Sequence, residues 1–154
     1  MNRVRILGIG SPSGDDQAGW LVVDALQASG VQTGVDLVIE KLDRPGANLI
    51  ASVENAAWVI LVDAMQGCGE AGRIRRFGAN DWPAYGGGIS SHGFGVVDAL
   101  TLARELGSLP HRLDLYGIEA GSALPGEEPS LAVKAAARRL AASLAAELAS
   151  ARQA

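Results

Sequence analysis

The sequence has only one cysteine, Cys68, among its 154 residues. A single thiol cannot form an internal disulfide, and it cannot supply the several sulfur ligands of a cysteine-rich zinc site. Proteins without disulfides suit a reducing compartment. We therefore expect a cytoplasmic protein.

Long hydrophobic runs and excess basic charge are also missing. No apolar stretch approaches the roughly 20 residues that a helix needs to cross a bilayer. We expect no signal peptide, because the N-terminus has no long apolar segment followed by a small-residue cleavage site. The 13 lysines and arginines are outnumbered by 17 aspartates and glutamates, for a net charge of −4. We expect neither a membrane nor a nucleic acid as a partner.

The residues that are present favour one folded domain. Hydrophobic residues make up 48% of the chain and charged residues 19%, a balance that excludes disorder. A chain of this length can bury one hydrophobic core, and no repeat or linker divides it. We expect a single domain over residues 1–154.

Short apolar runs alternate with segments of helical periodicity. The runs predict strands at 4–9, 35–39, 58–62 and 113–118, with an edge strand at 72–78. Apolar residues at helical spacing predict helices at about 18–26, 96–103 and 133–148. Alternating strands and helices favour right-handed βαβ units. The expected fold class is α/β, with a twisted, mainly parallel sheet and helices on both faces.

The loop after the first predicted strand, GIGSPSGDDQAG at 8–19, looks like a phosphate-binding loop but departs from one. Its glycines are spaced one residue too widely for a dinucleotide fingerprint, and no Gly-Lys-Ser/Thr follows. Asp15 and Asp16 would repel a phosphate. Each aspartate alone is explained as a helix cap. The loop disfavours a flavodoxin-like cofactor domain, which stays an alternative.

Four polar residues stand where the carboxyl ends of parallel strands converge on one crevice. Asp16, Asp43 and Asp63 follow or end predicted strands, and His92 precedes a predicted helix. Each has an ordinary structural explanation when taken singly. Together, oxygen and nitrogen ligands with open coordination positions suit a divalent metal such as nickel or zinc.

Three blocks of the sequence resemble the hydrogenase maturation proteases, the endopeptidases that process the large subunit of [NiFe]-hydrogenases. The blocks are GIGSPSGDDQAGWLVVDAL, VILVDAMQGCGEAGRIRRF and SSHGFGVVDALTLARELGSLPHRLDLYGIEA. They occur in the family's order and cover about residues 3–120. The chain departs from the family at Gly10-Ser11-Pro12, where Gly-Asn is common, and at DRPGANL, which replaces an Asp-x-Gly-Thr-like block. These departures leave the choice of hydrogenase open.

The resemblance implies an enzyme that removes the C-terminal extension of a large-subunit precursor after nickel insertion. It implies that Asp16, Asp63 and His92 form a nickel-sensing metal site, with Asp43 as a further catalytic aspartate near the same cleft. The nickel would be carried by the substrate and not held permanently. Either a metal that polarises the scissile carbonyl or a carboxylate base fits the hydrolysis.

Two further alternatives stay open. A non-catalytic chaperone would bind the same precursor without cutting it. A cysteine protease would use Cys68 with His92, but no basic neighbour in sequence lowers the pKa of that thiol. Serines 11, 13, 90 and 91 lack the pattern of a nucleophile elbow.

Overall fold

The computed structural model of the chain describes residues 3–66, 69–78 and 95–153. Its five strands are β1 (Val4–Gly10), β2 (Leu37–Asp43), β3 (Trp58–Met65), β4 (Ile74–Gly78) and β5 (Arg112–Glu119). Its helices are the 3-10 turn η1 (Gly14–Gln17) and the α-helices α1 (Ala18–Ala28), α2 (Leu49–Val53), α3 (Val96–Glu105) and α4 (Leu131–Gln153). Within the described residues, no helix is long and apolar enough to cross a membrane.

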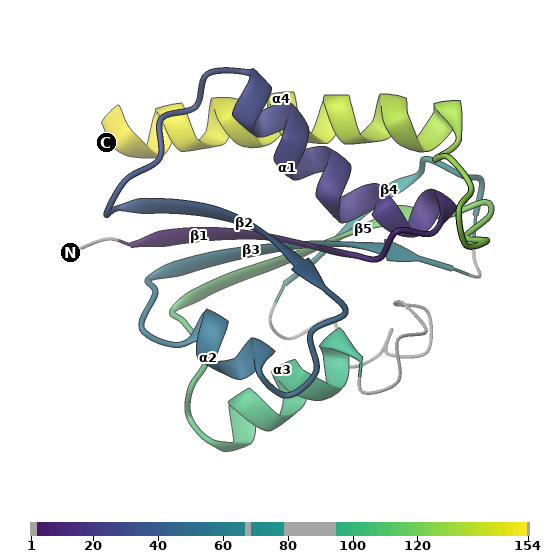
Figure 1. Ribbon diagram of the computed structural model, residues 1–154. Coiled ribbons are helices and arrows are strands. Elements are labelled where there is room, and N and C mark those ends of the chain that lie inside the picture. The colour runs from purple at the N-terminus through teal and green to yellow at the C-terminus, as the bar shows by residue number, and fades with distance from the viewer. Residues whose placement is uncertain (1–2, 67–68, 79–94, 154) are drawn as a thin grey trace.

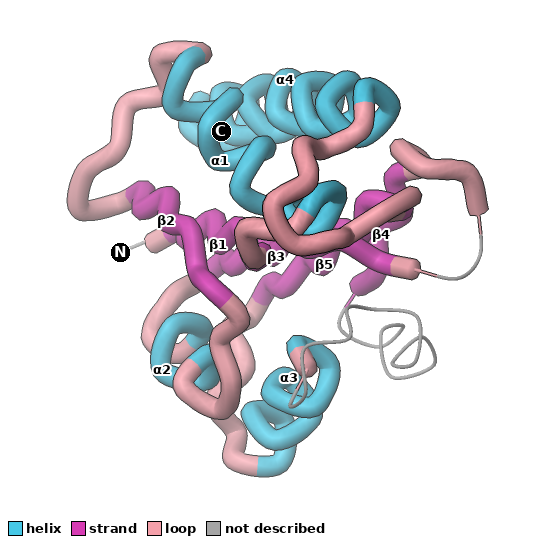
Figure 2. The backbone as a smooth tube through the Cα atoms, turned by 45° about the vertical axis from the view of Figure 1, so that its right-hand side comes forward, coloured by secondary structure: helices cyan, strands magenta, loops and turns pink. Residues whose placement is uncertain are grey.

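The strands form one sheet in the order β2-β1-β3-β5-β4 (Figure 2). The pairs β1–β2, β1–β3 and β3–β5 are parallel, and β4 joins the edge antiparallel to β5. The expected α/β class, the mainly parallel sheet and the edge strand at 72–78 are therefore confirmed.

Helices cover both faces of the sheet, with α1 and α4 on one side and α2 and α3 on the other (Figure 1). Alternate residues of the central strands enter two separate cores, because side chains alternate across a strand. Ile60 and Val62 pack with α1 and α4. Val59 and Leu61 pack with α2 and α3. All eight residues of β3 are buried, including the apolar run at 58–62 that predicted a strand covered on both faces.

Two strand boundaries differ from the sequence prediction. The strand expected at 35–39 is β2, which begins at Leu37 and continues to Asp43; Val35 is 69% exposed. The central strand continues past its apolar run, so that Asp63 lies within β3 and not after it. Pairing of Asp63 with Gly117 of β5 extends the strand beyond the local pattern.

Close packing of α1 on the sheet sets the position of η1. A Cβ at Gly8 would lie 2.3 Å from the Gly19 carbonyl oxygen, and one at Gly19 would lie 2.3 Å from that of Ile9. Only glycine permits this approach. The loop of 11–17 therefore lies against the carboxyl edge of the central strands, where β3 contacts η1.

Candidate functional site

Asp63 is a fully buried carboxylate near the carboxyl end of β3. Its Oδ1 accepts a 2.8 Å hydrogen bond from the backbone N–H of Ala64. Its Oδ2 is buried and accepts none. Burial raises the pKa of Asp63 well above its usual range, the negative charge of Asp16 raises it further, and the Ala64 N–H acts in the opposite direction.

Asp16 lies in η1 and is 8% exposed. Its Oδ2 accepts a hydrogen bond from the Oγ of Ser11, a residue that is itself buried. The loop closes on itself through the backbone, since the Asp16 N–H donates to the Ser13 carbonyl at 2.9 Å. Because η1 contacts β3 and the charge of Asp16 raises the pKa of Asp63, the structure brings the two aspartates near each other from distant parts of the sequence. Ser11, which sequence reasoning assigned to a turn, orients the Asp16 carboxylate.

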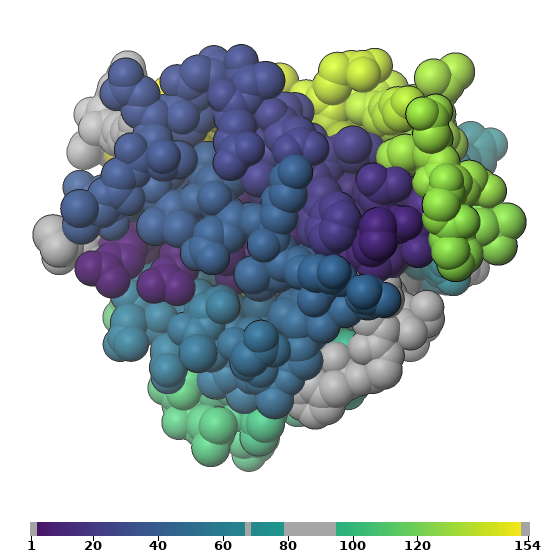
Figure 3. Space-filling view, viewed as in Figure 1, coloured from purple at the N-terminus to yellow at the C-terminus, as the bar shows by residue number. Residues whose placement is uncertain are grey.

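Asp15 has a different, structural role. Its carboxylate accepts hydrogen bonds from the N–H groups of Gly121 at 2.7 Å, Ser122 at 3.4 Å and Ser130 at 2.6 Å, and from the Ser130 hydroxyl at 3.0 Å. It holds the loop that precedes α4 against η1. Figure 3 shows this lime-green loop packed beside the purple segment that leads into α1. Asp15 therefore has a structural role, as its explanation by a capping function predicted in kind, but it serves the loop before α4.

Asp43 is the last residue of β2 and pairs in register with Gly10, which places it at the same edge of the sheet. Its side chain is 53% exposed and accepts a 2.7 Å hydrogen bond from the Nε of Arg44. The hydrogen bond and the charge of Asp43 raise the pKa of Arg44, with a smaller contribution from Asp16. Asp43 is therefore at the exposed rim of the site, ion-paired with an arginine that sequence reasoning missed.

His92 and Cys68 lie outside the described residues, as do Ser90 and Ser91. Among the residues that the structure describes, no three histidine, cysteine, aspartate or glutamate side chains are placed to hold a metal ion. The three-ligand set of Asp16, Asp63 and His92 stays a prediction. The open Oδ2 of Asp63 beside Asp16 fits a cation, because a buried anionic oxygen without a donor is stabilised by positive charge.

Sequence reasoning also missed Glu119, the last residue of β5. It is 1% exposed, and its Oε1 is buried without a hydrogen-bond partner. The signal was present as a charged residue ending a buried strand in the block LYGIEA.

Comparison with known proteins gives the site its context. The family model described as hydrogenase maturation protease matches residues 44–147. No curated protein sequence matches the chain. The hydrogenase maturating endopeptidase HybD from Escherichia coli has a similar structure, with 24% identity, a TM-score of 0.83, and coverage of 97% of this chain and 93% of that one.

A [NiFe] hydrogenase maturation protease, HycI from Thermococcus kodakarensis, matches with 26% identity, a TM-score of 0.75, and coverage of 94% of this chain and 90% of that one. The family match spans most of the chain and includes Asp63 and Glu119. The resemblance seen in the sequence is confirmed. The chain belongs to the hydrogenase maturation protease family, and it is an endopeptidase.

Proposed function

We propose that this endopeptidase removes the C-terminal extension of a [NiFe]-hydrogenase large-subunit precursor, in the cytoplasm, after nickel has been inserted. The support for this substrate is the family match together with the name of the similar protein from Thermococcus kodakarensis. The supporting observation within the chain is the buried Asp63 with an open oxygen beside Asp16.

Nickel belongs to the substrate in this proposal. Two carboxylates and the imidazole of His92 leave an octahedral ion half unsatisfied. Such a site holds a free ion loosely, but it binds well to an ion that thiolates of a docked precursor already anchor. The burial of Asp63 strengthens this preference, because a buried anion gains more from an approaching cation than a solvated one does.

The chain's own residues then have distinct tasks. Asp16, oriented by Ser11, and Asp63 face the docked nickel centre with His92. Asp43, exposed and paired with Arg44, contacts the precursor at the rim. Hydrolysis follows either from polarisation of the scissile carbonyl by the precursor's metal or from general-base help by a carboxylate.

One assay tests the proposal directly. The protein is mixed with a nickel-loaded precursor and with the same precursor free of nickel, and the masses of the products are measured. We expect a shorter C-terminus only in the nickel-loaded sample. Pretreatment of the protease alone with a chelator, followed by removal of the chelator, should leave this activity intact.

Two results would contradict the proposal. Rapid cutting of the nickel-free precursor would exclude nickel sensing. Stable association with the nickel-loaded precursor without a shortened product would identify a chaperone in place of a protease for this substrate.

A further inference from the structure

Most buried acidic side chains in the described part of the chain have hydrogen-bond donors. Asp15 accepts from three backbone N–H groups and a hydroxyl. Asp114, 4% exposed, accepts from the indole N–H of Trp58 and from Arg76 and Arg112. Among the described residues, the buried carboxylate oxygens without a partner are Oδ2 of Asp63 and Oε1 of Glu119.

These two carboxylates lie on one face of neighbouring strands. Asp63 pairs in register with Gly117, and Met65 pairs with Glu119. Glu119 is therefore level with Met65, two residues further than Asp63 toward the carboxyl edge of the sheet, and lies diagonally across from Asp63. The space between them is filled by Met65, since a Cβ at Gly117 would lie 2.3 Å from its sulfur.

The Met65 side chain separates the surroundings of Glu119 from those of Asp63 and Asp16. Glu119 is not grouped with Asp16 and Asp63 as a metal-binding set within the described residues. It adjoins the β3–β4 connection instead, because a Cβ at Gly69 would lie 3.4 Å from the Glu119 Cγ. Glu119 is thus beside the proposed nickel-sensing pair but not part of it.

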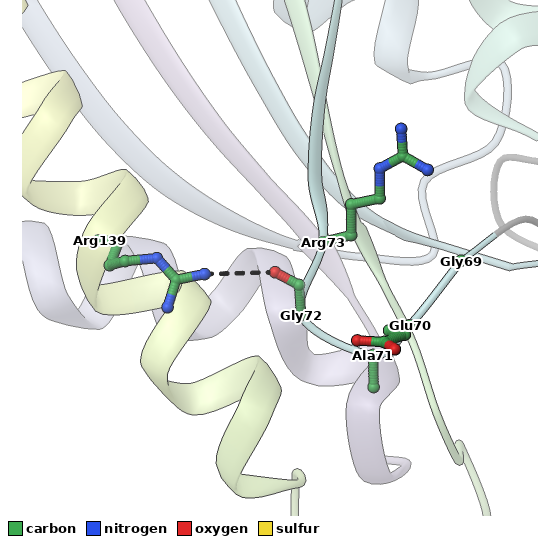
Figure 4. A pocket seen from close by; sticks show the side chains of 6 residues that line it. All are labelled: Gly69, Glu70, Ala71, Gly72, Arg73 and Arg139. Carbon is green, nitrogen blue, oxygen red and sulfur yellow. Dashed lines mark hydrogen bonds between the residues drawn. The ribbon is translucent and has the colours of Figure 1, made fainter.

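The basic residue described beside Glu119 is Arg73. The Glu119 N–H donates to the Arg73 carbonyl at 2.8 Å, and a Cβ at Gly69 would lie 3.4 Å from the Glu119 Cγ and 3.5 Å from an Nη of Arg73. Gly69 lines a pocket of about 500 Å³ together with residues 70–73 and Arg139. Arg139 donates to the Gly72 carbonyl at 3.5 Å, and the side chains of Arg139 and Arg73 extend to opposite sides of this segment (Figure 4). No described residue forms an ion pair or a side-chain hydrogen bond with Glu119.

A buried carboxylate without a donor is destabilising, whereas a methionine or glutamine of similar volume would carry no charge into the core. We propose that Glu119 is a specificity-determining residue that accepts a hydrogen bond from a donor group of the precursor docked at the carboxyl edge of β3 and β5. This role rests on the proposed function. The donor is either a backbone N–H or a cationic side chain of the precursor.

Variants of Glu119 test the role by separating binding from folding. We expect Glu119→Met to keep or raise the thermal midpoint, because it removes the buried charge. With the nickel-loaded precursor, its KM should rise about tenfold or more, as for loss of a hydrogen bond to a charged group, with a much smaller change in kcat. Glu70→Gln removes a charge from the adjacent exposed loop and should leave KM unchanged.

Glu119→Gln distinguishes the two donors. An amide still accepts from a backbone N–H, so a KM close to that of the wild type identifies that partner. A KM raised as in Glu119→Met identifies a cationic side chain, and replacing each basic residue near the cleavage site of the precursor then locates it.

Two outcomes overturn this role while leaving the proposed function intact. One is an unchanged KM in Glu119→Met. The other is a lower thermal midpoint in both Glu119 variants, which would make the residue structural. Failure of the wild type to cut the nickel-loaded precursor is a different result, because it removes the proposed function and this role together.

Discussion

The carboxylate of Asp15 accepts a 2.6 Å hydrogen bond from the backbone N–H of Ser130, a residue 115 positions further along the chain. The Ser130 hydroxyl in turn accepts from the N–H of Val133 in the first turn of α4. Asp15 therefore connects η1 to the start of the final helix. Its neighbour Asp16 instead accepts from Ser11, and its charge raises the pKa of Asp63, so two adjacent, identical residues have separate roles.

Asp15→Ala should destabilise the fold strongly. The substitution leaves buried N–H donors of the loop before α4 without an acceptor, and we expect a loss of about 3 kcal/mol or more in the free energy of unfolding. Urea denaturation measures it. Asp24→Ala removes an exposed ion pair with Lys41 and should cost no more than about 0.5 kcal/mol. Equal losses of unfolding free energy in the two variants would mean that the Asp15 hydrogen bonds stabilise the fold no more than an exposed ion pair does.

Ser11→Ala should slow processing while the fold persists. Asp16 loses the hydroxyl donor that orients it, and loss of such a supporting contact reduces metal affinity or activity by about 10- to 100-fold. Ser11→Thr keeps the hydroxyl and should restore most of the activity. Ser13→Ala, in the same loop, is the control and should process the precursor at the wild-type rate. Activity in Ser11→Ala equal to that of the control would show that Asp16 needs no orientation.

Asp63→Asn should be more stable than the wild type at neutral pH and inactive. The pKa of Asp63 is raised above its ordinary value of 3.8 by burial and by Asp16. The folded state therefore holds the proton more tightly than the unfolded state does, so the stability that protonation provides is present below about pH 4 and is lost as pH rises through the folded pKa.

Thermal unfolding at several pH values checks this prediction. The midpoint of Asp63→Asn should match the wild type near pH 3 and exceed it increasingly at higher pH, because asparagine has no charge to bury. If the difference in midpoint between Asp63→Asn and the wild type shrinks as pH rises, the pKa of Asp63 is not raised in the folded state and the explanation is wrong. Full processing activity in this variant would exclude Asp63 as an anionic ligand of the substrate nickel.

His92→Gln should abolish processing and change the thermal midpoint little, by about 3 °C or less, because the sequence SSHGFG predicts a polar loop, where substitutions usually cost about 1 kcal/mol or less. His111→Gln is the matched control, since His111 is the other histidine of the chain and is exposed. Mass analysis of the precursor reads out both variants. A processing-competent His92→Gln would remove the imidazole from the proposed site.

Local sequence determined the elements of this protein well. The apolar run of β3 and the helical spacing of α1, α3 and α4 are properties of short segments, and they were sufficient to indicate a mainly parallel α/β sheet. The convergence of Asp16 and Asp63 was also predictable, because the carboxyl ends of adjacent parallel strands meet. The weak strand β2 was misplaced because its boundaries depend on pairing with β1.

The roles of individual carboxylates were decided only by the tertiary structure. Asp15 and Asp16 are adjacent aspartates that the local sequence does not distinguish. Only the hydrogen bonds from the loop before α4 give Asp15 its structural role. Glu119 looks like an ordinary strand end until β3 and β5 pair and Met65 lies across Gly117. Whether a buried carboxylate is satisfied depends on donors brought from distant segments, and a local pattern holds no information about them.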